Sequence, residues 1–152
     1  MITNTNEPCT SIFCAGSTQF AKPPFAHKTM ADLCEAVLNP LDVPKQQGDW
    51  VLMSGHQSRT FKEQEQHGQY NGIALDIDDN PPAFMALLDF IEETTGCANA
   101  VAYLTKSATK ERPKARAIVQ LANALGYADW VLAAQAFNDI AEEAGIIPDR
   151  AT

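Results

Sequence analysis

The sequence lacks the features that mark several large classes of protein. No apolar run reaches the roughly 18 residues that span a bilayer, and the polar residues 1–10 have neither the basic start nor the apolar stretch of a signal peptide. No GxxxxGK[ST], GxGxxG or GxSxG segment is present, which argues against P-loop, dinucleotide-binding and hydrolase-elbow sites. These absences predict a cytoplasmic protein that makes no contact with membranes.

Motifs for zinc and for disulfides are also missing. The four cysteines (Cys9, Cys14, Cys34 and Cys97) form no CxxC pair, and the three histidines lie far apart in the sequence. Thiols stay reduced in the cytoplasm, so free cysteines are expected and a zinc site is disfavoured.

Basic residues are few. The chain has 11 Lys and Arg against 19 Asp and Glu, which gives a formal net charge of -8. A protein whose whole surface binds nucleic acid is expected to be basic. Any contact with nucleic acid therefore requires a local basic patch, or the partner must itself be basic. The length of 152 residues and the hydrophobic share of 45% predict one compact unit with a core.

Apolar segments separated by turn residues follow one another from residue 71 onward. They are, in chain order, a strand at 73–77, a helix that Pro81 and Pro82 open and Gly96 ends, a strand at 98–104, a strand at 115–121, and a helix that Asp129 caps and Gly145 ends. This β-α-β-β-α order predicts an α+β fold with an RRM-like or ferredoxin-like split βαβ sheet and both helices on one face.

The first 49 residues are predicted to form an irregular N-terminal extension with a short helix at 30–39, capped by Thr29. A strand candidate at 50–53 could take an edge of the sheet. The polar segment 56–70 fits either an exposed connection or a hairpin arm. The expected division is thus an N-terminal arm over 1–49 and an α+β domain over 50–152, within one compact unit.

Two carboxylates, Asp76 and Asp78, stand at the end of the apolar strand 73–77. Residues i and i+2 of a strand point to the same face, so both carboxylates can share a divalent cation. Oxygen ligands suit Mg²⁺ or Mn²⁺. The alternative is a solvated acidic turn that leads into the next helix.

Basic residues concentrate between positions 106 and 116, which together carry a net charge of +4. Such a segment beside the two carboxylates could bind a triphosphate or a nucleic-acid backbone. The candidate phosphate-binding residues are Lys106, Ser107, Lys114 and Arg116. The alternative is a solvated, lysine-rich hairpin.

Three segments together resemble a known family. Residues 73–78 (IALDID), 103–109 (YLTKSAT) and 112–119 (RPKARAIV) are similar in order and spacing to the palm of the archaeo-eukaryotic primase superfamily, in particular to primase-polymerase domains of phage and plasmid replication proteins. Residues 136–150 resemble the helix and turn that precede the last strand of that palm.

The resemblance implies nucleotidyl transfer that depends on Mg²⁺ or Mn²⁺, with a nucleoside triphosphate and DNA as partners. Asp76 and Asp78 would be the catalytic metal ligands, and basic residues such as Lys106 and Arg116 would bind the triphosphate. Two features of the family are missing: Lys106 and Ala108 stand where the family has a histidine, and no closing strand follows the second helix. These departures make catalysis doubtful and favour a palm that keeps the fold without the reaction.

A second interpretation is a non-catalytic binding protein. Helix 81–96 and segment 129–149 carry acidic residues and no basic ones, and the candidate partner-binding residues are Glu92, Glu93, Glu142 and Glu143. An acidic helical face can be steered toward a basic, nucleic-acid-binding host complex. In size and charge the chain is similar to small phage-encoded anti-defence proteins such as anti-CRISPR inhibitors. Ordinary solubilising charge is the third interpretation.

Overall fold

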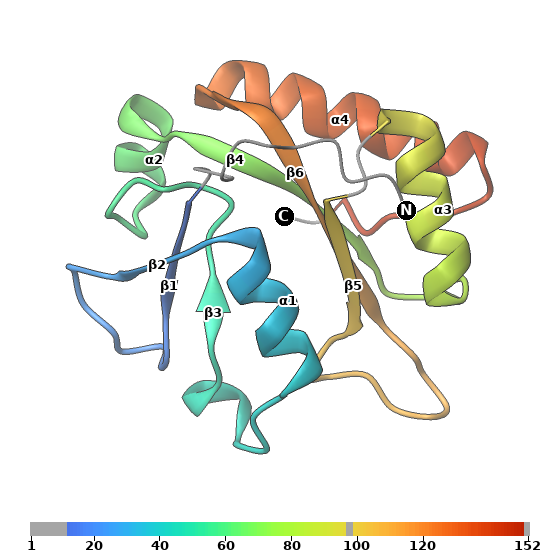
Figure 1. The fold of residues 1–152 in the computed structure, drawn as a ribbon, viewed down its shortest axis with the longest axis horizontal. Coiled ribbons are helices and arrows are strands. Elements are labelled where there is room, and N and C mark those ends of the chain that lie inside the picture. The colour runs from blue at the N-terminus through green and yellow to red at the C-terminus, as the bar shows by residue number, and fades with distance from the viewer. Residues whose placement is uncertain (1–11, 97–98, 151–152) are drawn as a thin grey trace. The chain divides into compact units, whose positions relative to one another are not determined.

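The computed structural model describes residues 12–96 and 99–150 of the chain (Figure 1). Helices are combined with two three-stranded sheets, of strand order β2-β1-β3 and β4-β6-β5, so the predicted α+β class is confirmed. None of the helices in the described part of the chain has the length and apolar character that a membrane span requires.

The chain divides into two compact units. One comprises the residues up to Gly72 together with Gln120–Tyr127, and the other comprises Ile73–Val119 together with the residues from Ala128 onward. Compactness alone does not make a unit a folding domain. The expected division into 1–49 and 50–152 therefore stays a prediction.

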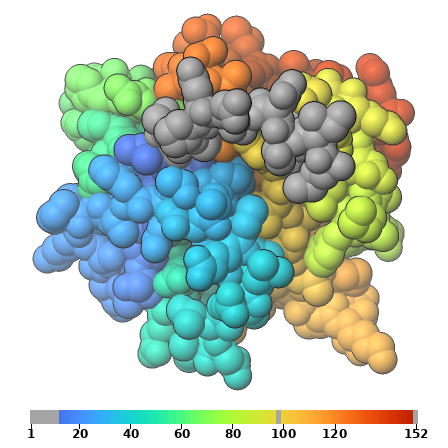
Figure 2. Space-filling view, viewed as in Figure 1, coloured from blue at the N-terminus to red at the C-terminus, as the bar shows by residue number. Residues whose placement is uncertain are grey.

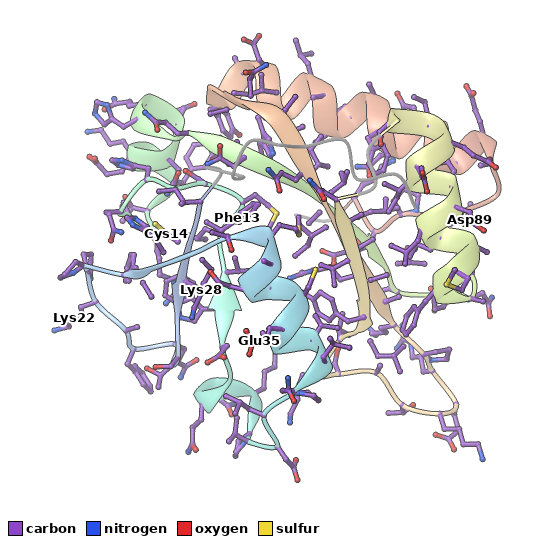
Figure 3. All side chains as sticks on the ribbon, viewed as in Figure 1. Phe13, Cys14, Lys22, Lys28, Glu35 and Asp89 are labelled. Carbon is purple, nitrogen blue, oxygen red and sulfur yellow. The ribbon has the colours of Figure 1, made fainter. Side chains whose placement is uncertain are left out.

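The first sheet is built from residues that the sequence pattern left irregular. Its central strand β1 (Phe13–Gly16) pairs antiparallel with β2 (Ala26–Lys28) and with β3 (Trp50–Val51). Phe13 and Cys14, both on β1 (Figure 3), are fully buried. The prediction of an irregular extension is therefore wrong for these strands, which are too short to show an alternating pattern. The strand at Trp50 pairs with β1 and does not take an edge of the other sheet.

Two helices and a 3-10 turn complete this unit. Helix α1 (Met30–Leu38) begins at the predicted cap, where Thr29 Oγ1 accepts a hydrogen bond from Asp32 N at 3.3 Å and Asp32 Oδ2 accepts one from Thr29 N at 2.8 Å. This reciprocal pair is a capping box. The turn η1 (Lys45–Gln47) precedes β3, and α2 (Phe61–His67) occupies the polar segment 56–70. That segment is thus helical, which neither alternative for it anticipated.

The second sheet confirms the predicted β-α-β-β-α order. Strand β4 (Tyr70–Ile77) is followed by α3 (Phe84–Thr95), β5 (Ala100–Leu104), β6 (Ala115–Leu125) and α4 (Tyr127–Glu143). The third strand in the series, β6, lies between the other two, which is the arrangement of a split βαβ unit. The rings of Phe90 on α3 and Phe137 on α4 lie 5.9 Å apart, so these helices are neighbours.

Glycines end both helices as predicted, with a φ of 68° at Gly96 and of 82° at Gly145. These left-handed conformations cost a glycine little because it has no Cβ. The helix starts are shifted from the prediction. Helix α3 begins at Phe84, after the two prolines, and α4 begins at Tyr127, which places Asp129 in the first turn and not at the cap. A carboxylate in the first turn still stabilises the helix dipole.

Residues beyond α4 return to the sheet. Asp149 N donates a hydrogen bond of 2.7 Å to the carbonyl oxygen of Asp76 on β4. Ile146 and Pro148 are buried. In the described part of the chain no strand follows α4, in agreement with the expectation. The tail nevertheless contacts β4, the edge strand beside which a fourth strand of this fold would pair.

Candidate functional site

Strand alternation sorts the side chains of β4 onto two faces. Ile73, Leu75 and Ile77 are buried, and Asp76 points to the opposite face because it lies between them. On β5 and β6, Tyr103 lies directly opposite Arg116. Since residues opposite each other in a sheet share a face, the aromatic ring, the guanidinium and the carboxylate can meet.

Arg116 and Asp76 form a two-point ion pair. Arg116 Nε donates to Asp76 Oδ1 at 2.5 Å, and Arg116 Nη2 donates to Asp76 Oδ2 at 2.9 Å. The Asp76 side chain is 17% exposed and that of Arg116 is 37% exposed. The hydrogen bonds to Asp76, above all, raise the pKa of Arg116. Burial raises the pKa of Tyr103, so this phenol stays protonated beside the pair at neutral pH.

The next two acids are paired in the same way. Lys114 Nζ lies 2.5 Å from Asp78 Oδ2, with side chains 18% and 38% exposed. Arg112 Nε lies 3.8 Å from Asp79 Oδ1, with both side chains largely exposed. We call these three pairs the ion-pair row: Asp76–Arg116, Asp78–Lys114 and Asp79–Arg112. Its three carboxylates and three cations cancel in formal charge.

The ion-pair row changes what the two predicted metal ligands can do. A divalent ion arriving alone would have to compete with Arg116 for Asp76 and with Lys114 for Asp78. Among the described residues, no three side chains of His, Cys, Asp or Glu form a group that could hold a metal ion. The donor chemistry of the two carboxylates suits Mg²⁺ or Mn²⁺. Their charge is already balanced, however, so an ion needs an accompanying anion to take over the two cations.

The four predicted phosphate-binding residues fall into two groups. Lys114 and Arg116 lie in the ion-pair row, whereas Lys106 and Ser107 are exposed in the hairpin that joins β5 to β6. The hairpin is closed by hydrogen bonds from Thr105 N to the Lys114 carbonyl and from Thr109 N to the Arg112 carbonyl, both of 3.0 Å. Figure 2 shows this hairpin projecting from the surface as the gold and orange lobe.

An apolar hollow that the sequence did not reveal lies at the same end of the sheet. It has a volume of about 250 Å³ and is lined by Pro81, Pro82, Ala83, Phe84, Leu104 and Pro113. The prolines were interpreted only as a helix start. Sequence alone could not show that Leu104 and Pro113, from the β5–β6 hairpin, meet them in space.

The predicted partner-binding acids also differ from one another. On α3, Glu92 and Glu93 are exposed and border an open hollow with Asp89 (Figure 3). On α4, Glu142 accepts a hydrogen bond of 2.9 Å from Arg150, which also binds Asp139 at 2.7 Å. Glu143 is exposed. The acidic charge of α4 is thus partly neutralised by the tail.

Thiols and histidines complete the search for reactive groups. Cys14 and Cys34 are free, as predicted, and burial raises the pKa of both thiols. Cys9 and Cys97 lie outside the described residues. The rings of His56 and His67 lie 5.7 Å apart, and His56 Nε2 is 3.8 Å from Glu63 Oε2. The sequence analysis missed this cluster, although the i, i+4 spacing of Glu63 and His67 was visible.

Comparison with protein-family models, with curated proteins and with solved structures found no match to this chain. The functional argument therefore rests on the geometry of the site and on the sequence motifs.

Proposed function

We propose that the protein binds a nucleoside triphosphate together with Mg²⁺ or Mn²⁺ at the ion-pair row, as a primase-type palm of a phage or plasmid replication protein. The observation that carries this proposal is the pairing of two carboxylates on β4 with two cations at β6 on one face of the sheet. A metal–nucleotide complex contains both partners that this arrangement could exchange.

The exchange would keep every charge paired. Asp76 and Asp78 would hold the ion, while Arg116 and Lys114 would turn to phosphate oxygens, for which guanidinium and ammonium groups are good donors. When bound, the ion would neutralise charge on the phosphates and lower the pKa of an attacking hydroxyl. Tyr103 would steady Arg116, because its phenol stays protonated and adjacent.

The fold supports the same proposal. The apolar side chains of β4 and the buried stripes of α3 and α4 call for packing against each other, which leaves the carboxylates on the face away from the helices. A sheet with helices on one face and carboxylates on the other is what the resemblance to a primase palm implies. The missing histidine concerns catalysis more than binding, so binding is the first property to test.

Calorimetric titration tests the proposal. Mn²⁺, ATP and the Mn²⁺–ATP complex are titrated separately into the wild type and into an Asp76→Asn/Asp78→Asn variant. We expect the wild type to bind Mn²⁺–ATP more tightly than either component alone, and the variant to lose that binding. A Glu92→Gln/Glu93→Gln variant is the control, because it removes the same charge from α3 and should bind as the wild type does.

The proposal is wrong if the wild type does not bind Mn²⁺–ATP, or if the control loses as much affinity as the Asp76→Asn/Asp78→Asn variant. If binding is found, primer synthesis on a DNA template by the wild type would extend the function from nucleotide binding to catalysis. Primer synthesis that survived in the Asp76→Asn/Asp78→Asn variant would exclude these carboxylates as catalytic metal ligands.

A second candidate function is favoured by the acidic surface of α3. Among the described residues, no lysine, arginine or histidine forms an ion pair with Asp89, Glu92 or Glu93, whereas Glu142 on α4 is paired. Such a surface suits a basic, nucleic-acid-binding host complex, as an anti-CRISPR-type inhibitor would require. Replacing the three α3 acids by their amides should slow association with such a complex at low salt, and equal rates for variant and wild type would exclude this surface.

A further inference from the structure

The apolar hollow beside α3 has the size and the lining of a site for one flat ring system. Its volume of about 250 Å³ lies below the roughly 300–1,000 Å³ of pockets that take drug-sized ligands. Its lining is entirely apolar, and Phe84 and Leu104 remain 40% and 55% exposed. Proline rings fix the backbone on two sides, so the hollow does not have to be ordered by a ligand.

The hollow adjoins the cations of the ion-pair row. Pro113 lies between Arg112 and Lys114 in the chain, and Pro81 follows Asp79 by two residues. Figure 1 shows the turn after β4, the start of α3 and the β5–β6 hairpin at the same end of the sheet. A small apolar surface is thus placed next to a cluster of groups that can bind phosphate.

From this juxtaposition we infer that the hollow receives the nucleobase of the nucleoside triphosphate. The inference rests on the proposed function and adds the part of the nucleotide that the ion-pair row does not bind. The triphosphate would contact Arg112 and Lys114, and the base would pack against the ring of Phe84. A nucleotide has the same division into a charged and a flat apolar part, whereas a peptide would need a longer groove.

The lining also predicts the specificity. No polar side chain lines the hollow among the described residues, so no side-chain hydrogen bond can distinguish one base from another. Every base has an aromatic face that can stack on a ring. We therefore expect the affinities for ATP, GTP, CTP and UTP to agree within about fivefold, since discrimination depends on hydrogen bonds to base edges.

Two neighbouring residues provide a matched test. Phe84 lines the hollow, whereas Met85, the next residue of α3, is 69% exposed and does not line it. Calorimetry compares the wild type with Phe84→Ala and Met85→Ala, using Mn²⁺–ATP and Mn²⁺–tripolyphosphate as probes. Phe84→Ala should weaken Mn²⁺–ATP binding about tenfold, a typical loss for one stacked base. It should leave tripolyphosphate binding unchanged, and Met85→Ala should change neither.

The outcomes separate this inference from the proposed function. If the wild type binds both probes and Phe84→Ala binds Mn²⁺–ATP as tightly as the wild type, the base does not use the hollow, while the metal–phosphate site stands. If Phe84→Ala weakens both probes equally, or Met85→Ala has the same effect, the change acts through the fold and the inference is wrong. If the wild type binds neither probe, the proposed function itself fails.

Discussion

Removing the carboxylate of Asp76 should destabilise the protein, because Arg116 would keep its charge and lose its two-point partner. The Asp76 side chain is 17% exposed and Arg116 is 37% exposed, so the pair lies between a surface pair and a buried one. Exposed pairs contribute about 0–1 kcal/mol, and removing one partner of a buried pair costs about 3–5 kcal/mol. We expect Asp76→Ala to lower the free energy of unfolding by about 2 kcal/mol.

A double-mutant cycle separates the pair from the individual residues. Urea unfolding is measured for the wild type, Asp76→Ala, Arg116→Met and the double variant, and we expect a coupling energy of about 1–2 kcal/mol. The second cycle, with Asp79→Ala and Arg112→Met, is the control. This pair is 3.8 Å apart and mostly exposed, so its coupling should stay below about 0.5 kcal/mol. Additive effects in the first cycle, or equal coupling in both, would refute the geometry of the ion-pair row.

Three further predictions concern the fold and its response to pH. Thr29→Ala should lower the free energy of unfolding by about 1 kcal/mol because it removes the cap of α1. The hydrogen bonds from Thr29 lower the pKa of Asp32, so its contribution is present above its unfolded pKa and lost as the pH falls through the folded pKa; the stability difference between wild type and Asp32→Asn should vanish in acid. Burial raises the pKa of Tyr103, so stability is full below the unfolded pKa near 10 and lost above it; thermal melts of Tyr103→Phe should show a smaller loss at alkaline pH. Gly96→Ala should cost about 1 kcal/mol in urea unfolding because its φ is 68°, whereas Gly126→Ala, with equally open space and no positive φ, should cost less.

The sequence predicted the elements with long, regular patterns and missed those that depend on partners. Strand β4 and helix α3 have apolar residues at the spacing of a strand and of a helix, and both were found close to their predicted positions. Strand β2 has only three residues, all exposed, and exists through its pairing with β1. Helix α2 has no apolar stripe, and its buried Gln64 donates hydrogen bonds to the carbonyls of His56 and Ser58. Neither feature leaves a periodic signal.

The candidate site shows the same limit in chemical terms. Alternation along β4 was enough to predict that Asp76 points away from the core. It could not show that Arg116 lies across from it, because the register between strands β4 and β6 is set by the whole sheet. The pairing reverses the meaning of the motif for a free metal ion. Two adjacent carboxylates attract a cation, whereas two carboxylates already bonded to cations attract it only if an anion comes with it.

The net charge of the chain gives an independent way to separate the two proposed functions. The ion-pair row contains three of the 19 acidic and three of the 11 basic residues, so the excess of eight negative charges lies entirely outside it. A triphosphate therefore approaches a neutral site through a repulsive field, which salt weakens. Its association rate should rise with ionic strength, whereas the rate for a basic partner at α3 should fall. The sign of the salt dependence thus identifies which surface a bound molecule has used, because the net charge acts on both approaches and the local chemistry on only one.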